Sequence, residues 1–222
     1  MLHSEQYWIE AYSAKEALWI HDGNPRRPHA LLTSGNHSNG FFNSRPVIAD
    51  DELMYEASDD LLRAFLRDGG NVLEVDGVVG PQTGATKLAK MLMAGLVYRT
   101  ERVVFFASPS KHEGDAGRFM IFSDEEHAQL PNKRVLLCED VLTIGGSVEL
   151  TAEATMAAGA RVLPYLLVLV NRSGLAEVGG KKIVALINRP MPMWMPEECP
   201  LCKAGSEAIR PKDNWTRLNA AY

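Results

Sequence analysis

Short apolar runs and amphipathic segments alternate along this chain. Residues 135–138 and 161–170 are continuous apolar runs, which are typical of strands buried on both faces of a sheet. Three further apolar segments, at residues 76–79, 102–106 and 183–187, also predict strands. The longest run, 161–170, suits the centre of a parallel sheet.

Four other segments have the spacing and composition of helices. Residues 51–66 place apolar side chains on one face and end before an Asp-Gly-Gly turn. Residues 6–20, 87–96 and 148–158 are the other predicted helices, and the sequence DGNPRRP at residues 22–28 breaks the first of them. A chain of 222 residues can bury the core of one α/β domain with a small appendage.

Residues 133–159 carry the clearest chemistry. The strand 135–138 is followed at once by Glu139 and Asp140, then by a turn with two glycines and a predicted helix. Ligands of open parallel sheets bind at the carboxyl ends of the strands, and a glycine turn at a helix N-terminus offers N–H groups to a phosphate. The carboxylates can accept hydrogen bonds from sugar hydroxyls or hold water around a divalent cation. An ordinary strand–turn–helix capped by Ser147 is the alternative, but two adjacent carboxylates leaving a buried strand favour a phosphorylated sugar.

Three other segments are candidates for a ligand site. Residues 80–86, GPQTGAT, form a second strand–loop–helix transition with backbone donors for an anion. Residues 108–117 are polar and contain glycine, which is typical of a solvated hairpin tip. Phe41 and Phe42 interrupt the polar segment 29–47, where they either cover a planar ligand or belong to the core.

Arg172 lies just after the apolar strand 161–170. An arginine at the carboxyl edge of a buried strand can pair with a carboxylate or flank a carbonyl group. An isolated arginine is more often a surface residue. Arg172 is therefore a candidate for recognition of an anionic ligand, with a surface position as the alternative.

The composition excludes several partners. The formal net charge of −5 and the pI near 5.7 argue against nucleic acid and against an anionic membrane surface. No apolar run approaches the roughly 18 residues that a membrane span needs. The N-terminal segment is acidic and amphipathic and lacks the regions of a secretory signal. We therefore expect a cytoplasmic protein.

The three cysteines do not predict a disulfide framework. Cys199 and Cys202 form a CPLC pair, which is compatible with zinc or redox chemistry. Zinc would need two more ligands, and the chain has no second CxxC and no nearby HxxxH. A metal is the less favoured interpretation, and the role of the pair stays open.

The sequence LLCEDVLTIGGS at residues 136–147 resembles the ribose-phosphate-binding motif of type I phosphoribosyltransferases, which bind 5-phosphoribosyl 1-diphosphate (PRPP). Residues 80–89 resemble the pyrophosphate loop of that family, and residues 108–117 occupy the place of its flexible catalytic loop. Residues 29–47 and the W-x-P-E-x-CPLCKAG sequence of the tail resemble orotate phosphoribosyltransferases. The matching segments follow the family's order across residues 29–212.

The resemblance implies a doubly wound α/β fold with a mostly parallel sheet. It implies a single domain of residues 1–222, in which residues 1–48 and 188–222 form a small hood. The implied reaction joins orotate and PRPP to give orotidine 5′-monophosphate and pyrophosphate, with Mg²⁺, in pyrimidine biosynthesis. The implied assembly is a homodimer in which the catalytic loop reaches the neighbouring subunit's site.

The resemblance also implies roles for individual residues. Lys111, Glu139 and Asp140 are the implied catalytic residues, and the two carboxylates are also candidates for Mg²⁺ ligation. The implied PRPP contacts are Thr83, Gly84, Lys111, Glu139, Asp140, Val141, Leu142, Thr143, Ile144, Gly145, Gly146 and Ser147. The implied orotate contacts are Thr33, Phe41, Phe42, Thr143 and Arg172.

The chain departs from the family pattern at a few positions. Ile144 stands where the family usually has a small, often hydroxylated residue, and Asn171 replaces the usual aspartate before the arginine. Ala107 and Ser108 stand where basic residues usually precede the loop lysine. Three alternatives therefore stay open: transfer to another base, PRPP binding without catalysis, and a structural paralogue without a ligand.

Overall fold

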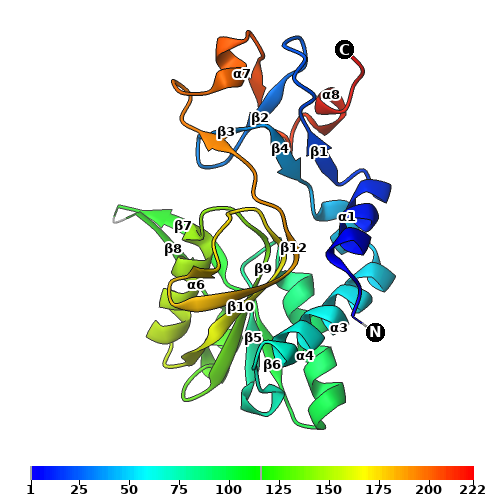
Figure 1. Ribbon diagram of the computed structural model, residues 1–222. Helices are drawn as coiled ribbons and strands as arrows, with labels where there is room; N and C mark the ends of the chain where they lie inside the picture. Colours follow the sequence, from blue (N-terminus) through cyan, green and yellow to red (C-terminus); the bar gives the residue numbers. More distant parts are fainter. Residues whose placement is uncertain (1, 116) are drawn as a thin grey trace.

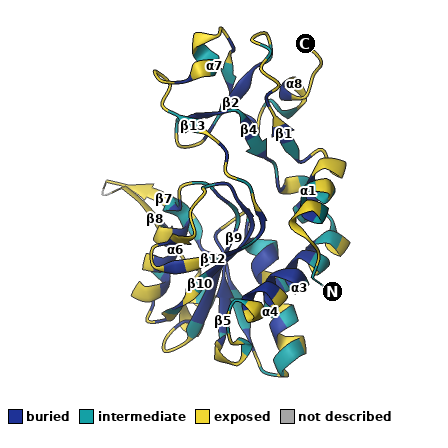
Figure 2. Ribbon diagram, viewed as in Figure 1, coloured by how far each residue is buried: buried dark blue, intermediate teal, exposed yellow. Residues whose placement is uncertain are grey.

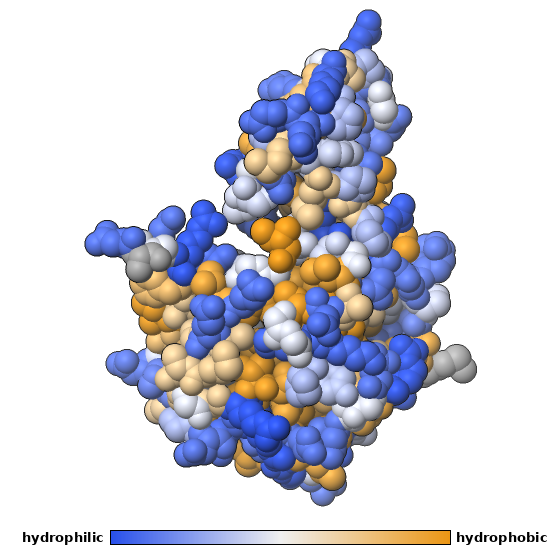
Figure 3. Space-filling view, turned by 60° about the vertical axis from the view of Figure 1, so that its left-hand side comes forward, coloured by the Kyte–Doolittle hydropathy of each residue, from blue (hydrophilic) through white to orange (hydrophobic). Residues whose placement is uncertain are grey.

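The computed structural model describes residues 2–115 and 117–222, which form a larger body and a smaller upper lobe (Figure 1). The body is a sheet with helices on both faces, as the dark, buried strands between the helices show in Figure 2. The upper lobe consists of residues 18–42 and 193–218, so it combines segments from both ends of the chain. The space-filling view shows the surface hollowed between the lobe and the body (Figure 3).

The body is built on a six-stranded sheet with the order β11-β12-β10-β9-β5-β6. The pairing of β11 with β12 is antiparallel, and the four other pairings are parallel. This arrangement confirms the prediction of a mostly parallel α/β sheet. The strands are β5 (Gly77–Val79), β6 (Phe105–Ala107), β9 (Arg134–Leu142), β10 (Arg161–Asn171), β11 (Glu177–Val178) and β12 (Lys181–Asn188).

Helices cover both faces of this sheet (Figure 1). On one face lie α1 (Glu5–Ala14), α3 (Asp51–Arg67) and α4 (Thr86–Thr100), and on the other lies α6 (Gly146–Ala157). The helix α3 begins where the Asp50 side chain accepts a hydrogen bond from the Leu53 N–H at 3.0 Å, the usual N-cap contact. The remaining elements of the body are α2 (Arg45–Ala49), the 3₁₀ turn Val72–Glu74, β7 (Ser110–Gly114), β8 (Gly117–Ile121) and α5 (Asp124–Gln129).

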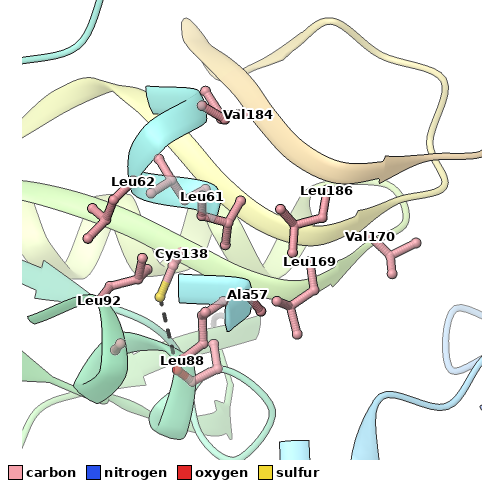
Figure 4. Close-up of a cluster of buried hydrophobic side chains, with 14 of the residues drawn as sticks. Ala57, Leu61, Leu62, Leu88, Leu92, Cys138, Leu169, Val170, Val184 and Leu186 are labelled. Atoms are coloured by element: carbon pink, nitrogen blue, oxygen red, sulfur yellow. Dashed lines mark hydrogen bonds between the residues drawn. The ribbon is translucent and has the colours of Figure 1, made fainter. Parts of the chain in front are cut away.

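The largest apolar cluster lies between the sheet and helices α3 and α4. Figure 4 shows Leu61 and Leu62 of α3 and Leu88 and Leu92 of α4 around Cys138 of β9, with Leu169 of β10 at one side of this group. Each of these side chains is at most 1% exposed. Burying such a side chain contributes about 1.5–3 kcal/mol, so this layer accounts for much of the stability of the body.

The upper lobe has a much smaller apolar cluster. Its four-stranded sheet has the order β13-β3-β2-β14, and a separate pairing joins β1 to β4. Its elements are β1 (Leu18–Ile20), β2 (His29–Leu31), β3 (His37–Ser38), β4 (Gly40–Phe42), β13 (Met193–Trp194), α7 (Pro200–Lys203), β14 (Ala208–Ile209) and α8 (Trp215–Leu218). The fully buried apolar residues of its cluster are Trp19, Ala30, Leu32, Ile209 and Leu218.

Three sequence predictions about elements need correction. The first helix ends at Ala14, because Glu16 takes a positive φ of 50° and residues 18–20 pair with β4 as a strand. The strand predicted at 102–106 begins only at Phe105. The strand predicted at 135–138 extends to Leu142, so the two carboxylates lie inside β9 rather than after it.

No helix in the described part of the chain is long and apolar enough to cross a bilayer.

Candidate active site

A cavity of about 1280 Å³ lies where the strand order of the body reverses. The chain passes from β5 outward to β6, and then returns past β5 to β9, β10 and β12. In open α/β sheets this reversal leaves a crevice beside the carboxyl ends of the two central strands, here β5 and β9. The cavity is lined by the ends of these strands, by the β7–β8 hairpin and by the upper lobe.

The loop after β9 has the geometry of an anion site. Gly145 adopts a φ of +90° and is the N-cap of the twelve-residue helix α6. A Cβ atom there would lie 2.4 Å from Cγ2 of Val178, so both the conformation and the space require glycine. The loop thus presents the N-terminus of α6 to the cavity. The Ile144 side chain is 56% exposed. At this position the loop therefore offers backbone N–H groups to an anion but no side-chain hydroxyl.

Glu139 and Asp140 lie at the base of the cavity. Glu139 is only 8% exposed, and its Oε1 accepts a hydrogen bond from the Asp140 N–H at 3.0 Å. Burial raises the pKa of Glu139 well above its usual value, and the adjacent Asp140 carboxylate raises it further. Two neighbouring acids in such a place either share a proton or require a cation or hydroxyl donors, which is typical of a functional site.

The loop after β5 meets these carboxylates directly. A Cβ atom on Gly84 would lie 2.7 Å from Cγ of Asp140, so only glycine allows this approach. The Thr86 and Ser108 hydroxyls lie 2.6 Å apart, and the Gln82 side chain donates to the Ser108 carbonyl oxygen at 2.8 Å. These contacts tie the loop to the segment after β6. The two glycine-containing loops therefore form one continuous wall of the cavity.

The β7–β8 hairpin brings Lys111 to the same wall. The Lys111 ammonium group donates a hydrogen bond to the Ser147 hydroxyl of the same chain at 2.8 Å. Arg118 of β8 also lines the cavity, at 3.7 Å from the Glu113 carboxylate. The sequence analysis missed Arg118, because it considered only the residues before and beside Lys111. The sequence did contain a signal, since Arg118 directly follows the polar segment 108–117 that holds Lys111.

Arg172 directly follows the last residue of β10 and is 1% exposed. Its Nη1 donates to the Gly40 carbonyl oxygen at 3.1 Å and its Nη2 donates to the Ser38 hydroxyl at 2.7 Å, so the side chain joins the body to the upper lobe. Its Nε has no hydrogen-bond partner among the described residues. Burial lowers the pKa of Arg172 to about 10, which still leaves the group charged at neutral pH. The surface alternative for this arginine is wrong.

The upper lobe contributes Thr33, Phe41 and Phe42 to the cavity wall. The ring of Phe42 also belongs to the core, where it packs edge-on against Tyr12 with centroids 5.4 Å apart. The ring of Phe41 packs against Trp215 at 6.0 Å. The core interpretation of this aromatic pair is therefore confirmed for the rings, and because both residues also border the cavity, a role in covering a planar ligand stays a prediction.

All the site residues implied by the sequence line this one cavity, although Leu142, Phe42 and Arg172 are each at most 3% exposed. Basic residues that the sequence did not single out also line it: Arg45, Lys87, Arg118 and Lys212. Lys87 is engaged elsewhere, since it pairs with Asp51 at 2.6 Å. The basic groups around the opening suit a ligand with several phosphates.

Comparison with known proteins decides the family. The orotate phosphoribosyltransferase of Sulfurovum sp. (strain NBC37-1) is 33% identical over 198 residues, which cover 82% of this chain and 90% of the relative. The enzyme of that name from Heliobacterium modesticaldum is 33% identical over 183 residues, covering 82% of this chain and 88% of the relative. The chain belongs to the orotate phosphoribosyltransferase family.

Solved structures of phosphoribosyltransferases have the same fold as this chain. Orotate phosphoribosyltransferase from Aeropyrum pernix superposes with a TM-score of 0.60 at 22% identity, covering 80% of this chain and 91% of that one. Adenine phosphoribosyltransferase from Rhodothermus marinus gives a TM-score of 0.55 at 20% identity, with 82% and 98% covered. No protein-family model matches the chain. The resemblance and the phosphoribosyltransferase fold predicted from the sequence are confirmed.

Proposed function

We propose that this chain transfers the 5-phosphoribosyl group of PRPP to orotate, giving orotidine 5′-monophosphate and pyrophosphate. The observation that carries the proposal is the meeting of two anion-binding loops, an acidic pair and a buried arginine around one cavity. Curated relatives of about one-third identity over most of the chain carry the name of this activity.

The reaction breaks the bond between the anomeric carbon and pyrophosphate and forms a bond to the base nitrogen. Its transition state resembles an oxocarbenium ion, as in glycoside cleavage, so the enzyme must stabilise separated charge. The loop 143–147 would hold the 5′-phosphate on its N–H groups and on the helix N-terminus. The carboxylates of Glu139 and Asp140 would accept hydrogen bonds from the ribose hydroxyls and fix the sugar.

Lys111 is the residue proposed to stabilise the departing pyrophosphate. Its ammonium group already reaches Ser147 of the phosphate loop, and the hairpin that carries it borders the cavity. A positive charge close to the leaving group lowers the barrier electrostatically. Arg118, on the next strand of the hairpin, would add to this field when it leaves Glu113.

Magnesium fits the residues around the carboxylates. Mg²⁺ prefers oxygen ligands, and Asp140 lies directly against the Gly84 loop, between the two anion-binding segments. Glu139 and Asp140 would hold the ion together with PRPP. When bound, Mg²⁺ supplies charge neutralisation to the pyrophosphate group.

Arg172 and the Phe41–Phe42 segment are the proposed base-recognition elements. Arg172 borders the cavity where the upper lobe meets the body, its buried Nε has no hydrogen-bond partner among the described residues, and a guanidinium group is suited to a carboxylate such as that of orotate. Because Arg172 also holds Ser38 and Gly40, it would couple the position of the lobe to the presence of the base.

Pyrophosphate release tests the proposal directly. The purified chain is mixed with PRPP, Mg²⁺ and one base at a time, namely orotate, uracil, adenine, guanine or hypoxanthine. We expect release with orotate far above that with the other bases. Release with another base only would assign a different phosphoribosyltransferase activity. Tight PRPP binding without release from any base would assign PRPP binding without catalysis.

A homodimer is also proposed, and its role in catalysis can be measured separately. In the family resemblance, the catalytic loop crosses to the neighbouring site, whereas here Lys111 contacts Ser147 of its own chain. Subunits carrying Lys111→Ala are mixed with subunits carrying Asp140→Asn. If the loop crosses, a mixed dimer has one intact site, and partial recovery of activity is expected after verified exchange. If the loop serves its own chain, no recovery is expected.

A further inference from the structure

Four metal-binding side chains meet inside the upper lobe, away from the chemistry described above. His29 of β2, His37 of β3 and Cys199 and Cys202 around α7 place one ligand atom each within 4.8 Å of all the others. His29 and Cys199 are completely buried, and His37 is 7% exposed. The sequence indicated Cys199 and Cys202 as two ligands, but it showed no second pair of ligands near them in the chain. The fold supplies them from about 170 residues away.

The separations match the edges of a tetrahedral zinc site. His29 Nε2 lies 3.0 Å from His37 Nδ1 and 3.5 Å from the sulfur of each cysteine, and the Cys202 sulfur lies 3.2 Å from His37 Nδ1. Zn–N bonds of about 2.0 Å and Zn–S bonds of about 2.3 Å at tetrahedral angles place ligand atoms roughly 3.3–3.8 Å apart. These four separations differ from the tetrahedral edges by a few tenths of an ångström at most, and the two remaining separations, from the Cys199 sulfur to the Cys202 sulfur and to His37 Nδ1, are within 4.8 Å.

The hydrogen bonds behind His29 orient it as a metal ligand. Ser206 donates its single hydroxyl proton to the Arg27 carbonyl oxygen at 2.6 Å, so its oxygen can only accept from His29 Nδ1, which lies 2.8 Å away. That bond places the imidazole proton on Nδ1 and leaves the lone pair of Nε2 directed at His37 and the two sulfurs. Such a partner behind the coordinating ring is the usual support of a histidine ligand.

We propose that His29, His37, Cys199 and Cys202 bind one structural Zn²⁺ ion. Two thiolates and two imidazoles form a donor set that suits zinc better than Mg²⁺ or Ca²⁺, which prefer oxygen. All four positions are filled by protein, which is typical of a structural site rather than a catalytic one. The ion would join the β2–β3 hairpin near the N-terminus to the helix α7 near the C-terminus.

The site lies where a small lobe needs support. The apolar cluster of the upper lobe has five fully buried side chains, far fewer than the cluster under α3 and α4. Small units with such limited cores are commonly stabilised by a metal or by disulfides. The loop between His29 and His37 carries Thr33 to the active-site cavity, and Ser38 next to His37 holds Arg172. Zinc would thereby fix the wall that faces the base.

Metal content tests the proposal without any assay of activity. The chain is produced in zinc-supplemented medium, purified without chelator and analysed by plasma mass spectrometry. We expect about one zinc ion per chain. Replacement by Co²⁺ should give the visible absorption of a tetrahedral ion together with a near-ultraviolet thiolate-to-cobalt band. A chelator strong enough to remove the metal should lower the temperature of unfolding.

Matched variants assign the ligands. Cys202→Ser and His37→Ala should each retain less than about one-tenth of the metal after dialysis against a weak chelator. Cys138→Ala replaces the third cysteine, which lies in the body, and His112→Ala replaces an exposed histidine of the β7–β8 hairpin; both should keep the full content. If the ligand variants are insoluble, the same assignment comes from alkylation: zinc should protect Cys199 and Cys202 from iodoacetamide in the native chain, and chelation should expose them.

Two results would overturn the proposal. One is a native chain that holds no zinc after purification and reconstitution, with Cys199 and Cys202 found as a disulfide or as free, reactive thiols. The other is a zinc content that does not change in Cys202→Ser and His37→Ala. Neither result depends on turnover, so failure of this proposal is distinct from failure of the proposed transferase activity.

Discussion

The body and the upper lobe are stabilised by different kinds of contact. The body buries a continuous layer of leucine side chains under two long helices, and its site rests on a parallel sheet. The lobe buries five apolar residues and is joined by polar contacts between distant parts of the chain, including Trp19 Nε1 to the Leu218 carbonyl oxygen at 2.9 Å. Under the proposed function, PRPP would bind to the half of the cavity with the large apolar core, and the base would bind to the half that depends on specific polar contacts.

Lys111→Ala, on the body side of the cavity, should have the largest effect on catalysis. Replacing Lys111 with alanine removes a positive charge from the body side of the cavity, next to Ser147. Loss of one such electrostatic contact typically lowers turnover by about 10²–10³-fold. We expect that loss in kcat with orotate, while calorimetry finds PRPP still bound. Arg118→Ala is the matched control and should lower turnover less, because Arg118 lies beside the Glu113 carboxylate, whereas Lys111 reaches Ser147 of the phosphate loop. Equal losses of kcat in both variants would show that the total positive charge of the hairpin, and not Lys111 in particular, stabilises the transition state.

A second test concerns the acidic pair on the body side. Asp140→Asn replaces one acceptor of the carboxylate with a donor, at a point where Gly84 leaves no room for rearrangement. A charge-assisted hydrogen bond contributes about 1.5–3 kcal/mol, so we expect PRPP to bind at least about tenfold more weakly in the presence of Mg²⁺. Calorimetric titration measures this directly. An unchanged affinity would remove Asp140 from the proposed site.

A third test moves to the contact between lobe and body. Arg172→Ala should raise the Michaelis constant for orotate by about tenfold or more and change that for PRPP far less, because a charge-assisted contact to the base is lost. Ser38→Ala is the matched control, since it removes one acceptor of Arg172 and leaves the guanidinium in place. The control should shift orotate affinity less than the arginine variant. Equal turnover of orotate by Arg172→Ala and the unmodified chain would contradict the recognition role.

The two regions also differ in how far the sequence predicts them. The central strands of the body are apolar runs, and the segment 139–147 carries its chemistry within one continuous stretch, so the local pattern was sufficient to predict both. The strand β9 was predicted too short because Glu139 and Asp140 are polar, although the sheet continues through them. In the lobe, strands of two or three residues, such as β3 and β14, leave almost no periodic signal.

The metal ligands illustrate the same limit. Cys199 and Cys202 are a recognisable pair, but His29 and His37 lie at the other end of the chain. Sequence spacing carries no information about contacts that a fold makes across such a distance. Arg172 was found from its place after a buried strand, whereas its bonds to Ser38 and Gly40 could not be inferred, because they depend on how the lobe docks on the body.

The last test concerns the free energy of unfolding and compares an ion pair of the body with an ion pair of the lobe. Asp76, before β5, accepts hydrogen bonds from the N–H and the side chain of Arg134 at 3.0 Å, and from Arg102 at 3.0 Å. These contacts, those of Arg134 first, lower the pKa of Asp76 to about 2. Because the pKa is lower in the folded state, the stabilisation is present above the unfolded value of 3.8 and is lost as the pH falls toward about 2.

We therefore expect Asp76→Asn to lower the free energy of unfolding by about 1–2 kcal/mol at pH 7, allowing for the partial exposure of its arginine partners. The difference from the unmodified chain should shrink as the pH falls from 4 toward 2, which urea unfolding at a series of pH values measures. Glu207→Gln is the matched change in the lobe, where the side chains of Glu207 and Arg217 are 60% and 49% exposed, and it should change stability much less. Since Asp76 lies at the end of β5 opposite the cavity, neither variant should alter the Michaelis constants. If the difference in free energy of unfolding between Asp76→Asn and the unmodified chain stayed constant with pH, then packing, and not the charge of Asp76, would stabilise the contact between β5 and β9.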